Sequence, residues 1–73
     1  MKKYKLKIKG LDCANCASEL ESHLQKIDII DNVSISFMTE NLIFECLEEN
    51  INAALEKIKK VIRKKEPDAY IEG

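Results

Sequence analysis

The chain has 73 residues, of which 45% are hydrophobic and 34% are charged, and its formal net charge is −1 at pH 7. This length suits one small domain with a thin core, and the interleaved lysines and glutamates leave no basic face of the kind that nucleic acid requires. No apolar run is long enough to follow the first lysines as a signal peptide or to cross a bilayer, so we expect a soluble, cytoplasmic domain.

The first predicted element is a strand over residues 4–10, with the sequence YKLKIKG. Apolar and lysine side chains alternate strictly along it, which is typical of a strand with one buried face. Residues 13–26 predict a helix, because their apolar side chains recur at helical spacing. That apolar stripe consists of Ala17, Leu20, Leu24 and Ile27.

Residues 32–37 (NVSISF) and 42–46 (LIFEC) predict two strands joined by a short turn over 38–41 (MTEN). Their expected inward side chains are Val33, Ile35, Phe37, Leu42, Phe44 and Cys46. Residues 50–65 predict an amphipathic helix with a basic C-terminal end that complements the helix dipole. Its expected apolar stripe is Ile51, Leu55, Ile58, Val61 and Ile62. Pro67 ends this helix, and residues 68–72 predict a last short strand.

The resulting order, strand–helix–strand–strand–helix–strand, predicts an α+β ferredoxin-like fold in one domain over residues 1–73. A four-stranded antiparallel sheet would carry both helices on one face, with the first and third strands at its centre. Residues 10–17, the 38–41 turn and the loop near Pro67 would then share one end of the molecule. Cys46 would lie about 15 Å from the turn, toward the other end.

The stretch GLDCANCA, residues 10–17, carries the chemistry. Cys13 is expected just before the first helix and Cys16 in its opening turn, where unpaired N–H groups and the helix dipole lower the pKa of a thiol. A Cys-x-x-Cys loop lets both sulfurs face a common point, as in many zinc and copper sites. Two sulfurs on an exposed loop leave the coordination shell open to an incoming thiol or carboxylate.

Asp12, directly before the first cysteine, favours a divalent ion. Two thiolates already give Cu⁺ a net charge of −1, and soft Cu⁺ gains little from a hard oxygen. Two thiolates bring Zn²⁺ to neutrality, and Asp12 can then supply a third ligand. The same reasoning admits Cd²⁺ and Pb²⁺. Asp12 is also a good helix N-cap residue, so it could ligate the ion, cap the helix, or alternate between the two roles.

GLDCANCA resembles the G-M-x-C-x-x-C-A motif of the heavy-metal-associated domain, with Leu11 in the place of the usual methionine of similar volume. The aspartate before the first cysteine and the segment KKEPDAYIE resemble N-terminal domains of P-type ATPases that export zinc, cadmium or lead. The resemblance implies metal ligation by Asp12, Cys13 and Cys16. It also implies a monomeric binding module, not an enzyme, that exchanges its ion with the transmembrane part of such an ATPase or with a metallochaperone.

Two other functions share the Cys-x-x-Cys pair. A Cu⁺ chaperone or copper-ATPase domain would use the same sulfurs, since thiolates bind Cu⁺ tightly. A thiol–disulfide oxidoreductase would need more chain and a cis-proline near the site, whereas Pro67 is the only proline. Cys46 is expected in the core and His23 on the surface, about 10 Å along the helix from Cys16. Lys64, Lys65 and Glu66 are expected at the metal end as solvated charges.

Overall fold

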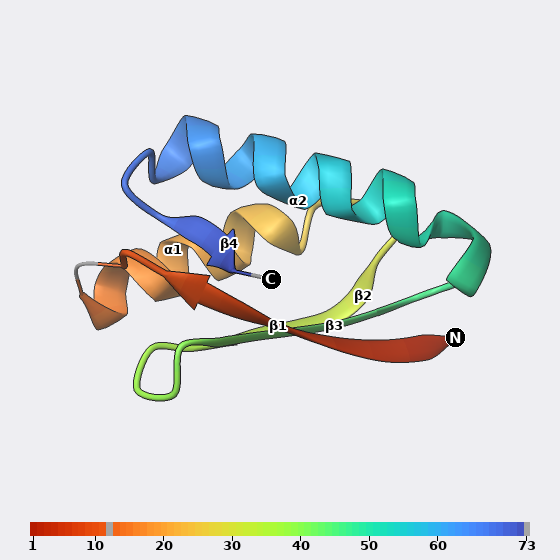
Figure 1. Ribbon diagram of the computed structural model, residues 1–73, viewed down its shortest axis with the longest axis horizontal. Coiled ribbons are helices and arrows are strands. Elements are labelled where there is room, and N and C mark those ends of the chain that lie inside the picture. Colours follow the sequence, from red (N-terminus) through yellow and green to blue (C-terminus); the bar gives the residue numbers. More distant parts are fainter. Residues whose placement is uncertain (12, 73) are drawn as a thin grey trace.

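The computed structural model describes residues 1–11 and 13–72. Its elements follow the predicted order, with a short 3₁₀ turn added before the second helix (Figure 1). They are β1 Lys2–Lys9, α1 Ala14–Leu24, β2 Asp31–Ser36, β3 Asn41–Cys46, η1 Glu48–Asn50, α2 Ile51–Lys65 and β4 Tyr70–Glu72. Phe37, predicted to end a strand, lies instead in the turn over residues 37–40, where Glu40 has a positive φ of 56° that breaks the extended backbone.

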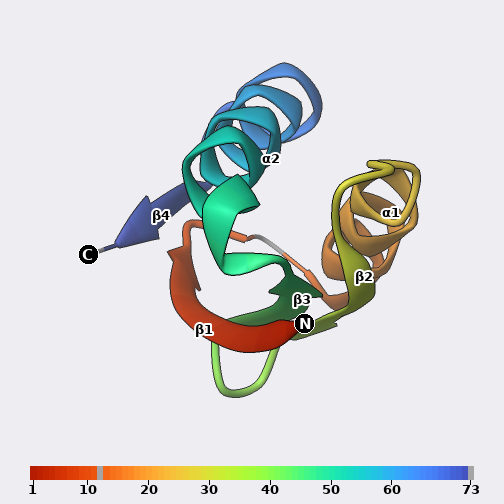
Figure 2. The ribbon, with the colours of Figure 1, turned by 90° about the vertical axis from the view of Figure 1, so that its right-hand side faces the viewer.

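The four strands form one sheet in the order β2-β3-β1-β4, and every neighbouring pair is antiparallel. β1 and β3 are therefore central, as predicted. Both helices cover the same face of the sheet (Figure 2), and the opposite face carries exposed β1 lysines. The predicted ferredoxin-like α+β fold is confirmed.

The core lies between the sheet and the two helices, and no charged or polar side chain is buried there among the described residues. Its buried members are Ile8, Ala17, Leu20, Leu24, Ile30, Val33, Leu42, Phe44, Cys46, Ala54, Ile58, Ile62 and Ala69. The buried stripe of α2 differs from the predicted one, because it runs through Ala54 while Ile51 and Leu55 are only half-buried. The side of α2 that faces the sheet is therefore centred on Ala54, Ile58 and Ile62.

Three loops meet at one end of the molecule, as predicted: the start of α1, the turn after β2 and the connection from α2 to β4 (Figure 1). The Ile8 N–H donates to the Glu40 carbonyl oxygen at 2.9 Å, and the Lys9 ammonium pairs with the Glu40 carboxylate at 3.1 Å. Gly10 has a φ of +83°, and a Cβ there would collide with the backbone of Asp68. The base of the cysteine loop is thus held by both neighbouring loops.

No helix within residues 1–11 and 13–72 is long and apolar enough to cross a membrane.

Candidate metal centre

The first helix begins at a sulfur cap. Cys13 is the N-cap of α1, with an extended backbone (φ −157°, ψ 162°), and its Sγ accepts the Cys16 N–H at 3.3 Å. This interaction satisfies one of the N–H groups that a helix leaves unpaired at its start. The predicted positions of Cys13 before the helix and Cys16 in its first turn are confirmed. Asp12, the predicted third ligand or cap, lies outside the described residues.

The two thiols are brought into direct contact. The Sγ atoms of Cys13 and Cys16 lie 2.9 Å apart and share a hydrogen bond. Cys13 is exposed and Cys16 is half-buried, so the pair opens to solvent on one side. Two sulfurs on one tetrahedral Zn²⁺, each at ~2.3 Å, are about 3.8 Å apart. The pair would need to separate by only about 1 Å to hold such an ion.

The pKa of Cys16 runs against the prediction from the helix dipole. Its thiol pKa is raised from 9.0 to about 12, first by the hydrogen bond with Cys13, then by hydrogen bonding with Glu66, and then by partial burial. The prediction of a lowered pKa for Cys16 was wrong, because hydrogen bonds with Cys13 and Glu66 favour the protonated thiol and partial burial disfavours the thiolate. Any ion that binds Cys16 as thiolate must displace this proton.

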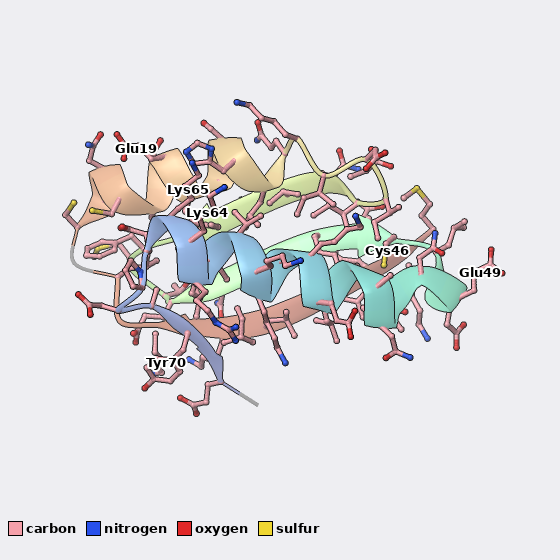
Figure 3. The ribbon with its side chains drawn as sticks, turned by 90° about the horizontal axis from the view of Figure 1, so that it is seen from above. Glu19, Cys46, Glu49, Lys64, Lys65 and Tyr70 are labelled. Atoms are coloured by element: carbon pink, nitrogen blue, oxygen red, sulfur yellow. The ribbon has the colours of Figure 1, made fainter. Side chains whose placement is uncertain are left out.

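Glu66, predicted to be a solvated charge at the metal end, instead lies close to the sulfur pair. It is the C-cap of α2 and is half-buried, and its backbone N–H donates to the Ile62 carbonyl oxygen at 2.7 Å. From that position its carboxylate reaches Cys16. Lys64 and Lys65 are exposed at the same end of α2, as predicted (Figure 3). The Glu66 carboxylate therefore borders the sulfur pair, whereas the Lys64 and Lys65 side chains are exposed to solvent.

The third cysteine and the histidine take no part in the pair. Cys46 is fully buried at the far end of β3, opposite Lys2 in the register, which confirms its predicted place in the core. Figure 3 shows it in the same half of the molecule as Glu49, away from Lys64. Burial raises the pKa of its thiol. His23 is half-buried on α1, less exposed than predicted. Among the described residues, no three His, Cys, Asp or Glu side chains gather closely enough to hold a metal ion.

The sequence is similar to a known family of domains and to a metal-transporting ATPase. The family model of the heavy-metal-associated domain matches residues 5–68. The chain is 35% identical over 60 residues to a cadmium, zinc and cobalt-transporting ATPase of Helicobacter pylori, a match that covers 82% of this chain. It spans only 8% of the length of that curated relative.

Solved structures with the same fold as this chain include a domain in its Zn(II) form and a copper-binding domain. The N-terminal domain of ZntA in its Zn(II) form superposes with a TM-score of 0.71 at 24% identity, covering 96% of this chain and 88% of that one. A copper-binding domain from HMA7, a P-type ATPase, superposes with a TM-score of 0.75 at 20% identity, covering 100% and 96%. At these identities the likeness concerns the fold alone.

Proposed function

The chain belongs to the heavy-metal-associated domain family, and from this premise we propose that it binds one divalent ion, Zn²⁺, Cd²⁺ or Pb²⁺, at Asp12, Cys13 and Cys16. Domains of this family are metal-binding modules, not catalysts. In this proposal residues 1–73 form a single monomeric module. It delivers its ion to a metal-exporting P-type ATPase, or regulates that ATPase according to its loading.

One observation carries the proposal: the two sulfurs lie 2.9 Å apart at the exposed start of α1. Thiolates are the preferred ligands of soft and borderline ions. Because the loop supplies only two sulfurs, a thiol or carboxylate of a partner can enter the shell, share the ion and remove it. The protein then acts by ligand exchange, and the ion is its cargo.

The charges beside the pair favour a divalent cargo. Two thiolates neutralise a doubly charged ion, and Asp12, next to Cys13 in the sequence, adds an oxygen donor that suits zinc better than copper. Glu66 adds a second carboxylate near Cys16. Both carboxylates would surround Cu⁺ with an excess of negative charge. The relative from Helicobacter pylori, named for cadmium, zinc and cobalt transport, supports the same choice.

A Cu⁺ carrier is the second candidate, since the copper-binding domain of HMA7 has the same fold. The test is a titration of the wild type and Asp12→Ala with zinc and with Cu⁺, each in a competing chelator buffer. We expect Asp12→Ala to weaken zinc binding by about tenfold or more, the scale found when groups supporting a metal site are lost, and to change Cu⁺ binding little. Glu19→Ala, which removes an exposed carboxylate of α1, is the matched control.

Equal losses for the two ions in Asp12→Ala would remove the argument for a divalent cargo. The double variant Cys13→Ser/Cys16→Ser should remain folded and bind neither ion, because the core is built from other residues. Stoichiometric zinc binding without turnover of a model disulfide would exclude the third candidate, a thiol–disulfide oxidoreductase.

A further inference from the structure

The outer edge of β4 offers unpaired backbone groups. β4 is the last strand of the sheet and pairs only with β1 among the described residues. Ile71 lies opposite Ile8, and the Ile8 N–H points to the other side, toward Glu40. When two residues that face each other across an antiparallel pair of strands form no hydrogen bonds with each other, each directs its N–H and C=O groups away from the other strand. The N–H and C=O of Ile71 therefore face outward, along the free edge.

A groove runs along this edge, between β4 and the C-terminal half of α2. It encloses about 310 Å³, and Ile62, Ala69 and Ile71 give it an apolar lining. Figure 2 shows β4 at the outer side of the sheet, beneath α2. Lys59 and Arg63 also line the groove, from α2. A strand added beside β4 would lie in this groove, with every second side chain directed toward α2.

Lys59 and Arg63 give the groove its charge. They are four residues apart in the sequence, so they lie on one face of α2, and both are exposed. Within residues 1–11 and 13–72, neither of the two cations has a carboxylate at ion-pairing distance. The ion pair found there joins Lys9 and Glu40. Two cations beside a free strand edge favour an incoming strand that carries carboxylates.

The other edge of the sheet lacks these features. β2 pairs with β3 through an irregular register between Asp31 and Ser34, and Asn32 has a positive φ of 52°. Such a bulge twists an edge and discourages further pairing. The two edges therefore differ, and the regular, cation-lined edge is that of β4.

We propose that the β4 edge is a docking site for an extended, acidic segment of another protein, which adds as a fifth strand beside Ile71 and places its carboxylates against Lys59 and Arg63. Main-chain hydrogen bonds would hold the strand, and the two cations would select its sequence. A second copy of this chain fits less well, because antiparallel pairing of two β4 edges would bring both sets of cations together. This proposal does not depend on the identity of the metal.

The test uses the metal-free protein and a blocked peptide of about six residues, an ordinary strand length, that alternates glutamate and threonine. NMR titration should shift the amide signals of Ile71 and the signals of Arg63. Lysine in place of glutamate in the peptide should weaken binding by about tenfold or more. Methylation of the peptide's backbone nitrogens that face β4, which are every second one, should abolish binding because it removes the N–H donors of the added strand.

A pair of charge-reversed variants separates the groove from the general charge of α2. Lys59→Glu/Arg63→Glu should lose binding of the glutamate peptide by about tenfold or more and gain binding of the lysine peptide. Lys57→Glu/Lys60→Glu changes the net charge equally, at exposed residues of α2 that do not line this groove, and should keep most of the affinity. Equal losses in the two variants, full binding of the methylated peptide, or no response at Ile71 would each overturn the proposal. Circular dichroism and unchanged zinc titrations would verify that both variants are folded.

Discussion

Gly10 lies directly against the backbone of Asp68, with a φ of +83° and no room for a Cβ. This contact joins the end of β1, from which the cysteine loop departs, to the connection between α2 and β4. Gly10→Ala should therefore lower the free energy of unfolding by about 1–3 kcal/mol, from the strained φ alone. It should also weaken zinc binding, because the loop base must move. Urea denaturation and zinc titration measure the two effects. Asn15→Ala, at an exposed position of α1, should change neither by a comparable amount.

The sulfur of Cys13 caps α1, and in our proposal it also binds the ion. Serine caps a helix well, whereas alanine does not. Cys13→Ser should thus keep most of the stability and lose zinc binding. Cys13→Ala should lose zinc binding and, in addition, about 1 kcal/mol of stability. Thermal denaturation of the two metal-free variants tests this difference. Equal stability of the serine and alanine variants would show that the Sγ cap contributes little.

Glu66 helps to hold the proton of Cys16. Glu66→Ala removes the second of the two hydrogen-bonding partners and should lower the pKa of Cys16 from about 12 toward its usual value. The pKa should remain raised, because the hydrogen bond with Cys13 is the larger cause. The ¹³Cβ chemical shift of Cys16, followed through the alkaline range in metal-free protein, reports this pKa. Glu19→Ala should leave it unchanged, and an unchanged value in Glu66→Ala would contradict the role given to Glu66.

The raised pKa of Cys16 also has a consequence for stability. The folded protein holds this proton more tightly than the unfolded chain, whose thiol has the usual pKa of 9.0. The contribution to stability is therefore fully present below that pH, and it is lost as the pH rises toward about 12. Urea denaturation of the metal-free wild type and of Cys16→Ser should show a steeper alkaline loss of stability in the wild type.

Cys46 should matter for folding and not for metal. It is fully buried beside apolar neighbours, so Cys46→Ser would bury a hydroxyl at a cost of about 1–3 kcal/mol. Zinc stoichiometry should stay at one ion per chain. Cys46→Ala, which leaves a small cavity instead of a polar group, is the companion variant. A loss of bound zinc in folded Cys46→Ala would contradict the separation of this thiol from the site.

The sequence was sufficient for the fold because its periodicities are clear. The alternation of lysine with apolar residues in 4–10 predicted β1, and the order of the elements with right-handed crossovers predicted its central antiparallel pairing with β3. The pattern of α2 was harder to interpret, because Ala54 is only weakly hydrophobic and yet is fully buried, whereas the larger Ile51 and Leu55 are half-buried.

Of the site, the sequence predicted which thiols come together but not how their protons are held. Fifty positions separate Cys16 from Glu66, and their proximity arises only when α2 ends beside the cysteine loop. The helix dipole alone predicted a lowered pKa for Cys16. Hydrogen bonds with Cys13 and Glu66, together with partial burial, raise the pKa instead.

The Cys13–Cys16 pair and the hydrophobic core occupy separate parts of this chain. Cys13 is exposed and Cys16 half-buried at one end, while the buried side chains lie between the sheet and the helices. In zinc fingers, by contrast, the ion itself holds the fold, and its removal unfolds the chain. Here an unloaded molecule should persist as a native protein, resistant to proteases. Under the proposed function, repeated rounds of loading and delivery would then require no refolding.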